Sequence, residues 1–188
     1  MQASRDGALV VFHDLRLDRL TRGRGPLRKR TLEELRTLGA GIPTLEEVLE
    51  LATGRIGVMV ELKRPYLYRR HDIVRRTIAL LDEEAVVISF EPKALQEVRR
   101  LRPELRTVQH VGFGVSIRRA AAYAWAAGFE DSRATPRALA RAQRLGLATT
   151  VYTVNDPGRM RELAARGVTG IFSDRPDLLS RTLLARPG

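Results

Sequence analysis

The chain has 188 residues, of which 44% are hydrophobic, and its net charge of +11 comes almost entirely from arginine. This length and composition fit one globular domain with a sizeable core, and the absence of cysteine excludes disulfides and thiolate metal sites. No apolar run approaches the roughly 20 residues of a membrane helix, and the first residues lack the apolar core of a signal peptide. We therefore expect a cytoplasmic protein.

The basic residues are scattered over predicted helices and loops, as at Arg28–Arg30 and Arg118–Arg119. No aromatic residues interleave with them, as they would in a protein that binds single strands, so no nucleic acid partner is expected. A solvated basic surface is the simplest interpretation. Attraction to an anionic membrane surface or an anionic substrate stays open.

The first predicted element is a strand over residues 7–12, and His13 and Asp14 follow it. Residues 15–29 are polar and predict a loop. Two capping boxes, one at 31–34 and one at 44–47, then predict short helices that end near residues 38 and 52.

From residue 58 onward, strands and helices alternate in a pattern typical of a parallel sheet with helices outside. We count six such strand–helix units, and no Gly-x-Gly-x-x-Gly turn supports a dinucleotide-binding fold. Residues 128–131 are predicted as a strand end or a turn. The other strands are predicted at 58–62, 86–90, 105–111, 148–154 and 168–173, and the helices at 72–82, 92–102, 116–127, 135–146, 156–167 and from 176.

The strand at 58–62 carries the most informative polar residues. Glu61 and Lys63 are two residues apart, so in an extended segment both side chains point the same way. The carboxyl ends of parallel strands are where sites of barrel enzymes are built. An acid and a base that share this end of a strand suggest a metal or a phosphate as the ligand.

Motifs along essentially the whole chain resemble, in order, those of the glycerophosphodiester phosphodiesterases, which are (β/α)₈ barrels related to bacterial phosphatidylinositol phospholipases C. The resemblance implies an α/β fold of the TIM-barrel type. The matching segments are 5–14, 17–23, 31–35, 42–48, 60–63 (Val-Glu-Leu-Lys), 88–90, 152–155 and 173–176.

The resemblance also implies a reaction, which is the metal-dependent hydrolysis of a glycerophosphodiester to an alcohol and glycerol 3-phosphate. His13 would belong to the acid–base pair. Glu61 would be a ligand of a divalent metal, Ca²⁺ or Mg²⁺, and Lys63 would bind a phosphate oxygen. Phe90 and Tyr152 would line the substrate pocket.

The chain departs from the family pattern at its start. The family's His-Arg motif and its Glu-x-Asp motif would lie before Met1, so one histidine and two metal carboxylates are expected to be missing. We therefore expect residues 1–188 to form a single partial barrel domain without its first two strands and first helix, with impaired activity and with open edges through which an oligomer could form. A fragment, a start placed too late and a decayed family member are the alternatives.

Each assignment has a simpler alternative. His13 could be a hydrogen-bonded loop histidine, Glu61 and Lys63 could be a plain ion pair, and Phe90 and Tyr152 could be packing residues. At the level of the whole chain, the alternatives are a non-catalytic barrel that binds phosphorylated ligands or a partner through its basic surface, and an unrelated binder of nucleic acid.

Overall fold

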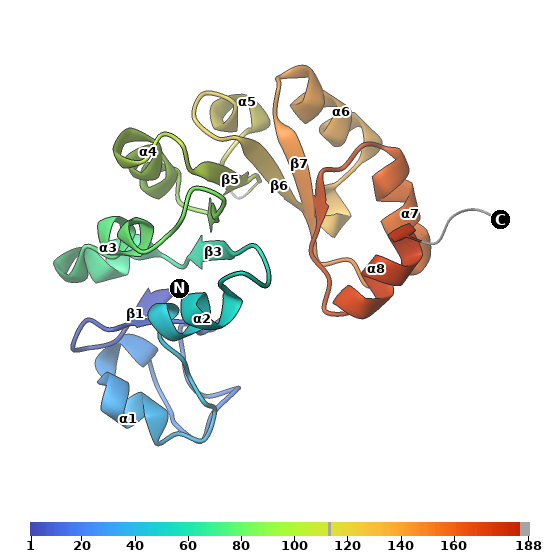
Figure 1. Cartoon of the computed structure of the whole chain (residues 1–188). Coiled ribbons are helices and arrows are strands. Elements are labelled where there is room, and N and C mark those ends of the chain that lie inside the picture. Colours follow the sequence, from blue (N-terminus) through green and yellow to red (C-terminus); the bar gives the residue numbers. More distant parts are fainter. Residues whose placement is uncertain (113, 185–188) are drawn as a thin grey trace. The chain divides into compact units, whose positions relative to one another are not determined.

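A computed structural model describes residues 1–112 and 114–184 of the chain (Figure 1). The chain divides into two compact units, Met1–Arg106 and Thr107–Gly188, and each is described by itself. The single-domain boundary expected over residues 1–188 stays a prediction. Within the described residues, no helix has the length and apolar character needed to cross a bilayer.

The first unit begins with a small antiparallel ribbon of β1 (Gln2–Ala3) and β2 (Leu9–Val10). The strand predicted over residues 7–12 is therefore shorter than expected, because its partner offers only two residues for pairing. Gly7 lies in the turn between the strands and has a φ of 87°, a conformation that favours glycine. Met1, the residue before β1, lies beside the end of β3, since Lys63 N donates to Met1 O at 3.1 Å.

The segment after the ribbon is held by a small core of its own. Both predicted capping boxes are present, one at Thr31 and one at Thr44, and each begins a helix with both reciprocal hydrogen bonds. The helical elements are η1 (Leu27–Lys29), α1 (Leu32–Arg36) and α2 (Leu45–Ala52). The core beneath them consists of Val10, Leu17, Leu27, Leu35 and Ile42.

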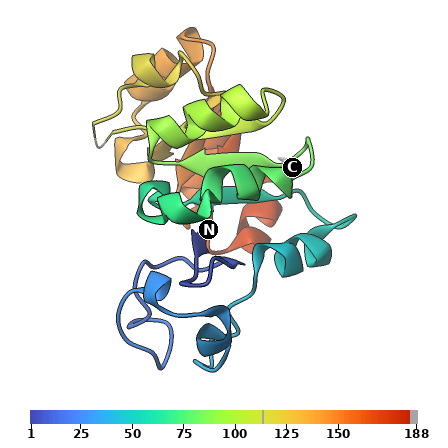
Figure 2. The ribbon, with the colours of Figure 1, turned by 90° about the vertical axis from the view of Figure 1, so that its left-hand side faces the viewer.

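The first unit also contains the parallel pair β3 (Met59–Leu62) and β4 (Val86–Ser89), with Glu61 in register with Ile88. Figure 2 views the chain from the side on which the helices α3 (Ile73–Ala79) and α4 (Pro92–Leu101) lie. The polar loop predicted after residue 62 contains a 3₁₀ helix, η2 (Pro65–His71), which the sequence pattern did not indicate.

The second unit contains parallel strands, each of which pairs with the next along the chain. Helices connect them, as the alternating pattern predicted. The elements are β5 (Arg106–His110), α5 (Ile117–Ala120), β6 (Ala126–Glu130), η3 (Asp131–Arg133), α6 (Pro136–Arg144), β7 (Ala148–Tyr152), α7 (Pro157–Ala165), β8 (Gly170–Ile171) and α8 (Pro176–Leu184).

The alanine-rich segment of this unit is the clearest difference from the sequence prediction. The helix expected over residues 116–127 ends at Ala120, and Ala126 and Ala127 instead begin β6. Both alanines are fully buried and pair with strands on either side. Their small side chains fit a crowded sheet interior, so tertiary packing overrides the helix propensity of alanine. Residues 128–130, expected as a strand end or a turn, belong to a full strand.

Candidate functional site

The carboxyl end of β3 carries an ion pair between Glu61 and Lys63, whose side chains point the same way, as the two-residue spacing predicted. Lys63 Nζ lies 2.7 Å from Glu61 Oε2, and the two side chains are only 18% and 24% exposed. Leu62 between them points to the opposite face and is buried. Glu61 Oε1 is also buried and has no hydrogen-bond partner among the described residues. One carboxylate oxygen is therefore held by the ammonium, while the other is left available for a ligand.

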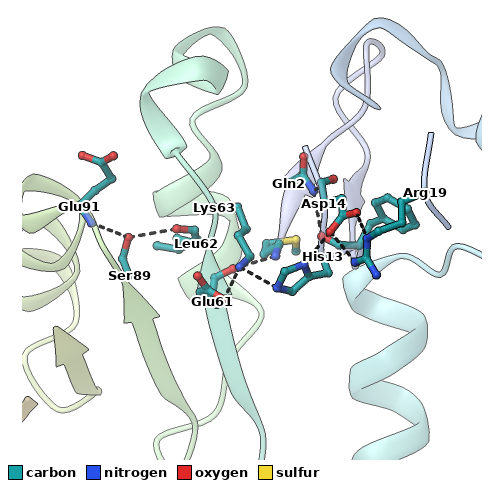
Figure 3. A network of polar contacts seen from close by, with 11 residues as sticks. Gln2, His13, Asp14, Arg19, Glu61, Leu62, Lys63, Ser89 and Glu91 are labelled. Carbon is teal, nitrogen blue, oxygen red and sulfur yellow. Dashed lines mark hydrogen bonds and ion pairs between the residues drawn. The ribbon is translucent and has the colours of Figure 1, made fainter. Parts of the chain in front are cut away.

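His13 reaches this ion pair from the loop after β2. The Lys63 ammonium donates to His13 Nε2 over 3.4 Å, although 50 residues separate the two in sequence. Figure 3 shows the Lys63 nitrogen between the Glu61 carboxylate and the His13 ring. The imidazole side chain is 71% exposed, so water and a substrate can reach it. Three sequence-predicted residues thus converge on one place in the first unit.

Asp14 and Arg19 extend the site beyond the residues that the sequence indicated. His13 Nδ1 lies 2.8 Å from Asp14 Oδ1, and Arg19 makes two hydrogen bonds to the same carboxylate. The Arg19 guanidinium, with a smaller contribution from His13, holds the pKa of the Asp14 carboxyl well below its usual range. The His-Asp pair was visible as neighbouring residues in the sequence, but the role of Arg19 had no spacing signal.

Gln2 holds the backbone on both sides of His13. Its amide nitrogen donates to the carbonyl oxygens of Phe12 and Asp14, each at 2.8 Å, and its amide oxygen accepts from Tyr68 Oη at 2.8 Å. Gln2 is fully buried. Burial of the Tyr68 phenol raises its pKa to about 12. The imidazole is exposed, whereas the backbone of the loop that carries it is held by the buried Gln2 side chain.

A buried serine joins the carboxyl ends of β3 and β4. Ser89 Oγ donates to the carbonyl oxygen of Leu62 and accepts from the backbone N–H of Glu91, both at 3.0 Å. These bonds, drawn in Figure 3, fix the end of β3 against the start of α4. The backbone between Glu61 and Lys63 is therefore tied to the neighbouring strand.

The two proposed pocket residues lie in different units. Phe90 follows β4 in the first unit and is 39% exposed. Tyr152 ends β7 in the second unit, where its ring lies edge-on to that of His110 with centroids 4.3 Å apart. Tyr152 is half-buried. That Phe90 and Tyr152 line a substrate pocket stays a prediction.

The metal expected from the resemblance meets an incomplete set of ligands. Within residues 1–112 and 114–184, no three histidine, aspartate or glutamate side chains gather so that they could hold an ion. Glu61 Oε1 is a hard oxygen suited to Ca²⁺ or Mg²⁺, but such ions take about six or more oxygens. The described residues fit one ligand position and do not fit a complete protein-built site.

Comparison with known proteins identifies the family. Residues 1–178 match the model of the glycerophosphoryl diester phosphodiesterase family. A glycerophosphodiester phosphodiesterase of Bacillus subtilis is 28% identical over 96% of this chain and 74% of its own length. One from Caldanaerobacter subterraneus is 29% identical over 95% of this chain and 82% of its own.

Comparison with solved structures leads to the same family. A phosphodiesterase from Oleispira antarctica, solved with the product sn-glycerol-3-phosphate, is 25% identical with a TM-score of 0.85, covering 96% of this chain and 81% of its own. The glycerophosphodiester phosphodiesterase from Agrobacterium tumefaciens is 28% identical with a TM-score of 0.73, covering 95% of this chain and 83% of its own. The chain therefore belongs to the glycerophosphoryl diester phosphodiesterase family and has its TIM-barrel type of fold.

Proposed function

We propose that this chain hydrolyses glycerophosphodiesters to an alcohol and sn-glycerol 3-phosphate, at the carboxyl end of β3. The observation that carries the proposal is the convergence of His13, Lys63 and Glu61, with Lys63 Nζ within 3.4 Å of the imidazole and 2.7 Å of the carboxylate. The family match over residues 1–178 supports the reaction class.

Lys63 is the proposed phosphate-binding residue. Its ammonium is a compact point charge, and it is mostly buried, so its attraction for a phosphate oxygen is screened less than that of a surface lysine. His13 is the proposed acid–base residue, because its exposed ring lies beside that ammonium. A phosphodiester bound at Lys63 would place its ester oxygens within reach of Nε2.

Glu61 is the proposed protein ligand of a divalent metal, through its buried Oε1. When bound, such a metal would polarise the phosphoryl group and offset its charge. Mg²⁺ is commonly held by one or two carboxylates together with waters and substrate phosphate, so one glutamate can contribute to a weak, substrate-assisted site. Turnover measured in Ca²⁺ and in Mg²⁺ distinguishes between the two metals.

Turnover by this chain is expected to be low. A single carboxylate gives weak metal affinity, and of the predicted site residues only His13 supplies an acid–base group beside Lys63. Phe90 and Tyr152 are proposed to contact the glycerol moiety. The cytoplasmic location also stays a prediction, which cell fractionation would test.

The test is hydrolysis of glycerophosphocholine, with glycerol 3-phosphate and choline assayed separately in Ca²⁺, Mg²⁺ or EDTA. We expect slow, metal-dependent release of both products, abolished by His13→Ala and retained by His71→Ala, a histidine outside the site. Release of phosphocholine would contradict the proposed cleavage. If no product forms but glycerol 3-phosphate still binds, the rival function, a non-catalytic barrel that binds phosphorylated ligands, is favoured.

A further inference from the structure

An exposed arginine fixes the carboxylate that contacts the His13 ring. Arg19 Nε donates to Asp14 Oδ2 at 2.8 Å, and Arg19 Nη2 donates to Asp14 Oδ1 at 2.9 Å (Figure 3). The planar fork of a guanidinium matches a carboxylate in this two-bond geometry. The Asp14 carboxylate is therefore held in one orientation while Oδ1 also meets His13 Nδ1 at 2.8 Å.

The two neighbours of the imidazole place its proton on the same nitrogen. An ionised carboxylate only accepts hydrogen bonds, so Nδ1, which faces Asp14, must be the donor. An ammonium only donates, so Nε2, which faces Lys63, must be the acceptor. Both contacts therefore select the neutral ring with its proton on Nδ1 and its lone pair on Nε2.

We infer that Asp14 and Arg19 are positioning residues for His13. Arg19 fixes the Asp14 carboxylate, and Asp14 holds the imidazole in the tautomer that presents the Nε2 lone pair to a ligand at Lys63. The consequence for turnover rests on the proposed function. The tautomer itself follows from the contacts and does not depend on any activity.

A matched control separates a positioning role from a purely structural one. The Arg19 side chain is 65% exposed, and its two-bond pair with Asp14 is of the kind that can add to stability, so the control must be a similar pair. Arg16, in the same loop, provides a matched control, since it is 62% exposed and pairs with Asp18, which has no hydrogen bond or ion pair to His13 in the described part of the chain. A structural role would affect Arg16 and Arg19 alike, whereas a positioning role singles out Arg19.

The test compares Asp14→Asn, Arg19→Gln and the control Arg16→Gln by long-range ¹H–¹⁵N correlation spectra of the imidazole nitrogens near neutral pH. The chain has only three histidines, and His13→Gln assigns the signals of His13. We expect Nδ1–H in the unchanged protein and in Arg16→Gln. In Asp14→Asn the fraction of Nε2–H should rise, since an amide can donate to Nδ1 as well as accept from it, and Arg19→Gln, which frees the Asp14 carboxylate to turn away from the ring, should give a smaller rise.

Nε2–H in the unchanged protein, or identical His13 spectra in Arg16→Gln and Arg19→Gln, would overturn the inference. Where glycerophosphocholine turnover is measurable, Arg19→Gln should lower kcat roughly 10- to 100-fold with little change in KM, as is common when the group that orients a functional imidazole is lost. Absent turnover with the expected tautomers would refute the proposed function and leave the positioning role intact.

Discussion

Replacement of Gln2 by leucine should destabilise the protein and release the loop that carries His13. Gln2 is fully buried and makes three hydrogen bonds of 2.8 Å, to the carbonyl oxygens of Phe12 and Asp14 and to the hydroxyl of Tyr68. Leucine has a similar volume but no hydrogen-bonding group. The change therefore removes the bonds without opening a large cavity.

The magnitude follows from the three bonds. A typical hydrogen bond contributes about 1 kcal/mol net, and a buried group left without a partner costs about 1–3 kcal/mol. The Tyr68 hydroxyl is buried, whereas the two carbonyl oxygens are only partly buried and can regain water. We expect a loss of about 2–3 kcal/mol in the free energy of unfolding, or roughly 4–12 °C in Tm for a chain of this size.

Urea unfolding followed by circular dichroism measures this loss. Tyr68→Phe removes only one of the bonds but leaves the buried Gln2 Oε1 without that donor, so it should cost about 1–3 kcal/mol. The double variant should lose less than the sum of the two single variants, because the tyrosine hydroxyl is no longer stranded. An unfolding free energy for Gln2→Leu within about 0.5 kcal/mol of the unchanged protein would refute the reasoning, since that is the range of neutral surface changes.

Three further predictions test other parts of the structure. Gly128→Ala places a Cβ 2.5 Å from His110 Nδ1 and should cost about 1–3 kcal/mol in urea unfolding, whereas Gly57→Ala, which meets nothing within 4 Å, should cost far less. Arg159→Met, which removes a half-buried guanidinium that binds two carboxylates and a carbonyl oxygen, should lower the unfolding free energy by about 2 kcal/mol. Because burial raises the pKa of Tyr68 from 10.0 to about 12, its proton stabilises the folded state fully below pH 10, and this contribution is lost as the pH rises through 12. An ultraviolet titration in which Tyr68→Phe removes no late-ionising phenol would contradict this pKa.

Local sequence rules predicted the parts of the site that lie within one strand. The alternation of side chains predicted that Glu61 and Lys63 point the same way, and the structure confirms this direction, with the two side chains 2.7 Å apart. The capping boxes at Thr31 and Thr44 were likewise predicted, because each is a short pattern whose hydrogen bonds close within four residues.

The parts that the sequence did not predict depend on contacts between distant residues. Nothing in the sequence singled out Gln2 among the first residues, and only the fold brings its amide to Tyr68, 66 residues away. Arg19 was one of many arginines in a polar loop, and no local period distinguishes the one that binds Asp14. Ala126 was assigned to a helix by composition, whereas burial between two strands decides its structure.

The most direct test of the account is the binding of sn-glycerol 3-phosphate, measured by calorimetry and by the ring signals of His13, in the unchanged protein and in Lys63→Met. Lys29→Met is the matched control, because it removes the same charge from an exposed position. We expect saturable binding that perturbs His13, a loss of roughly 10-fold or more in affinity for Lys63→Met, and little change for Lys29→Met. Equal affinities in the unchanged protein and Lys63→Met would show that the phosphate site lies elsewhere and contradict the account.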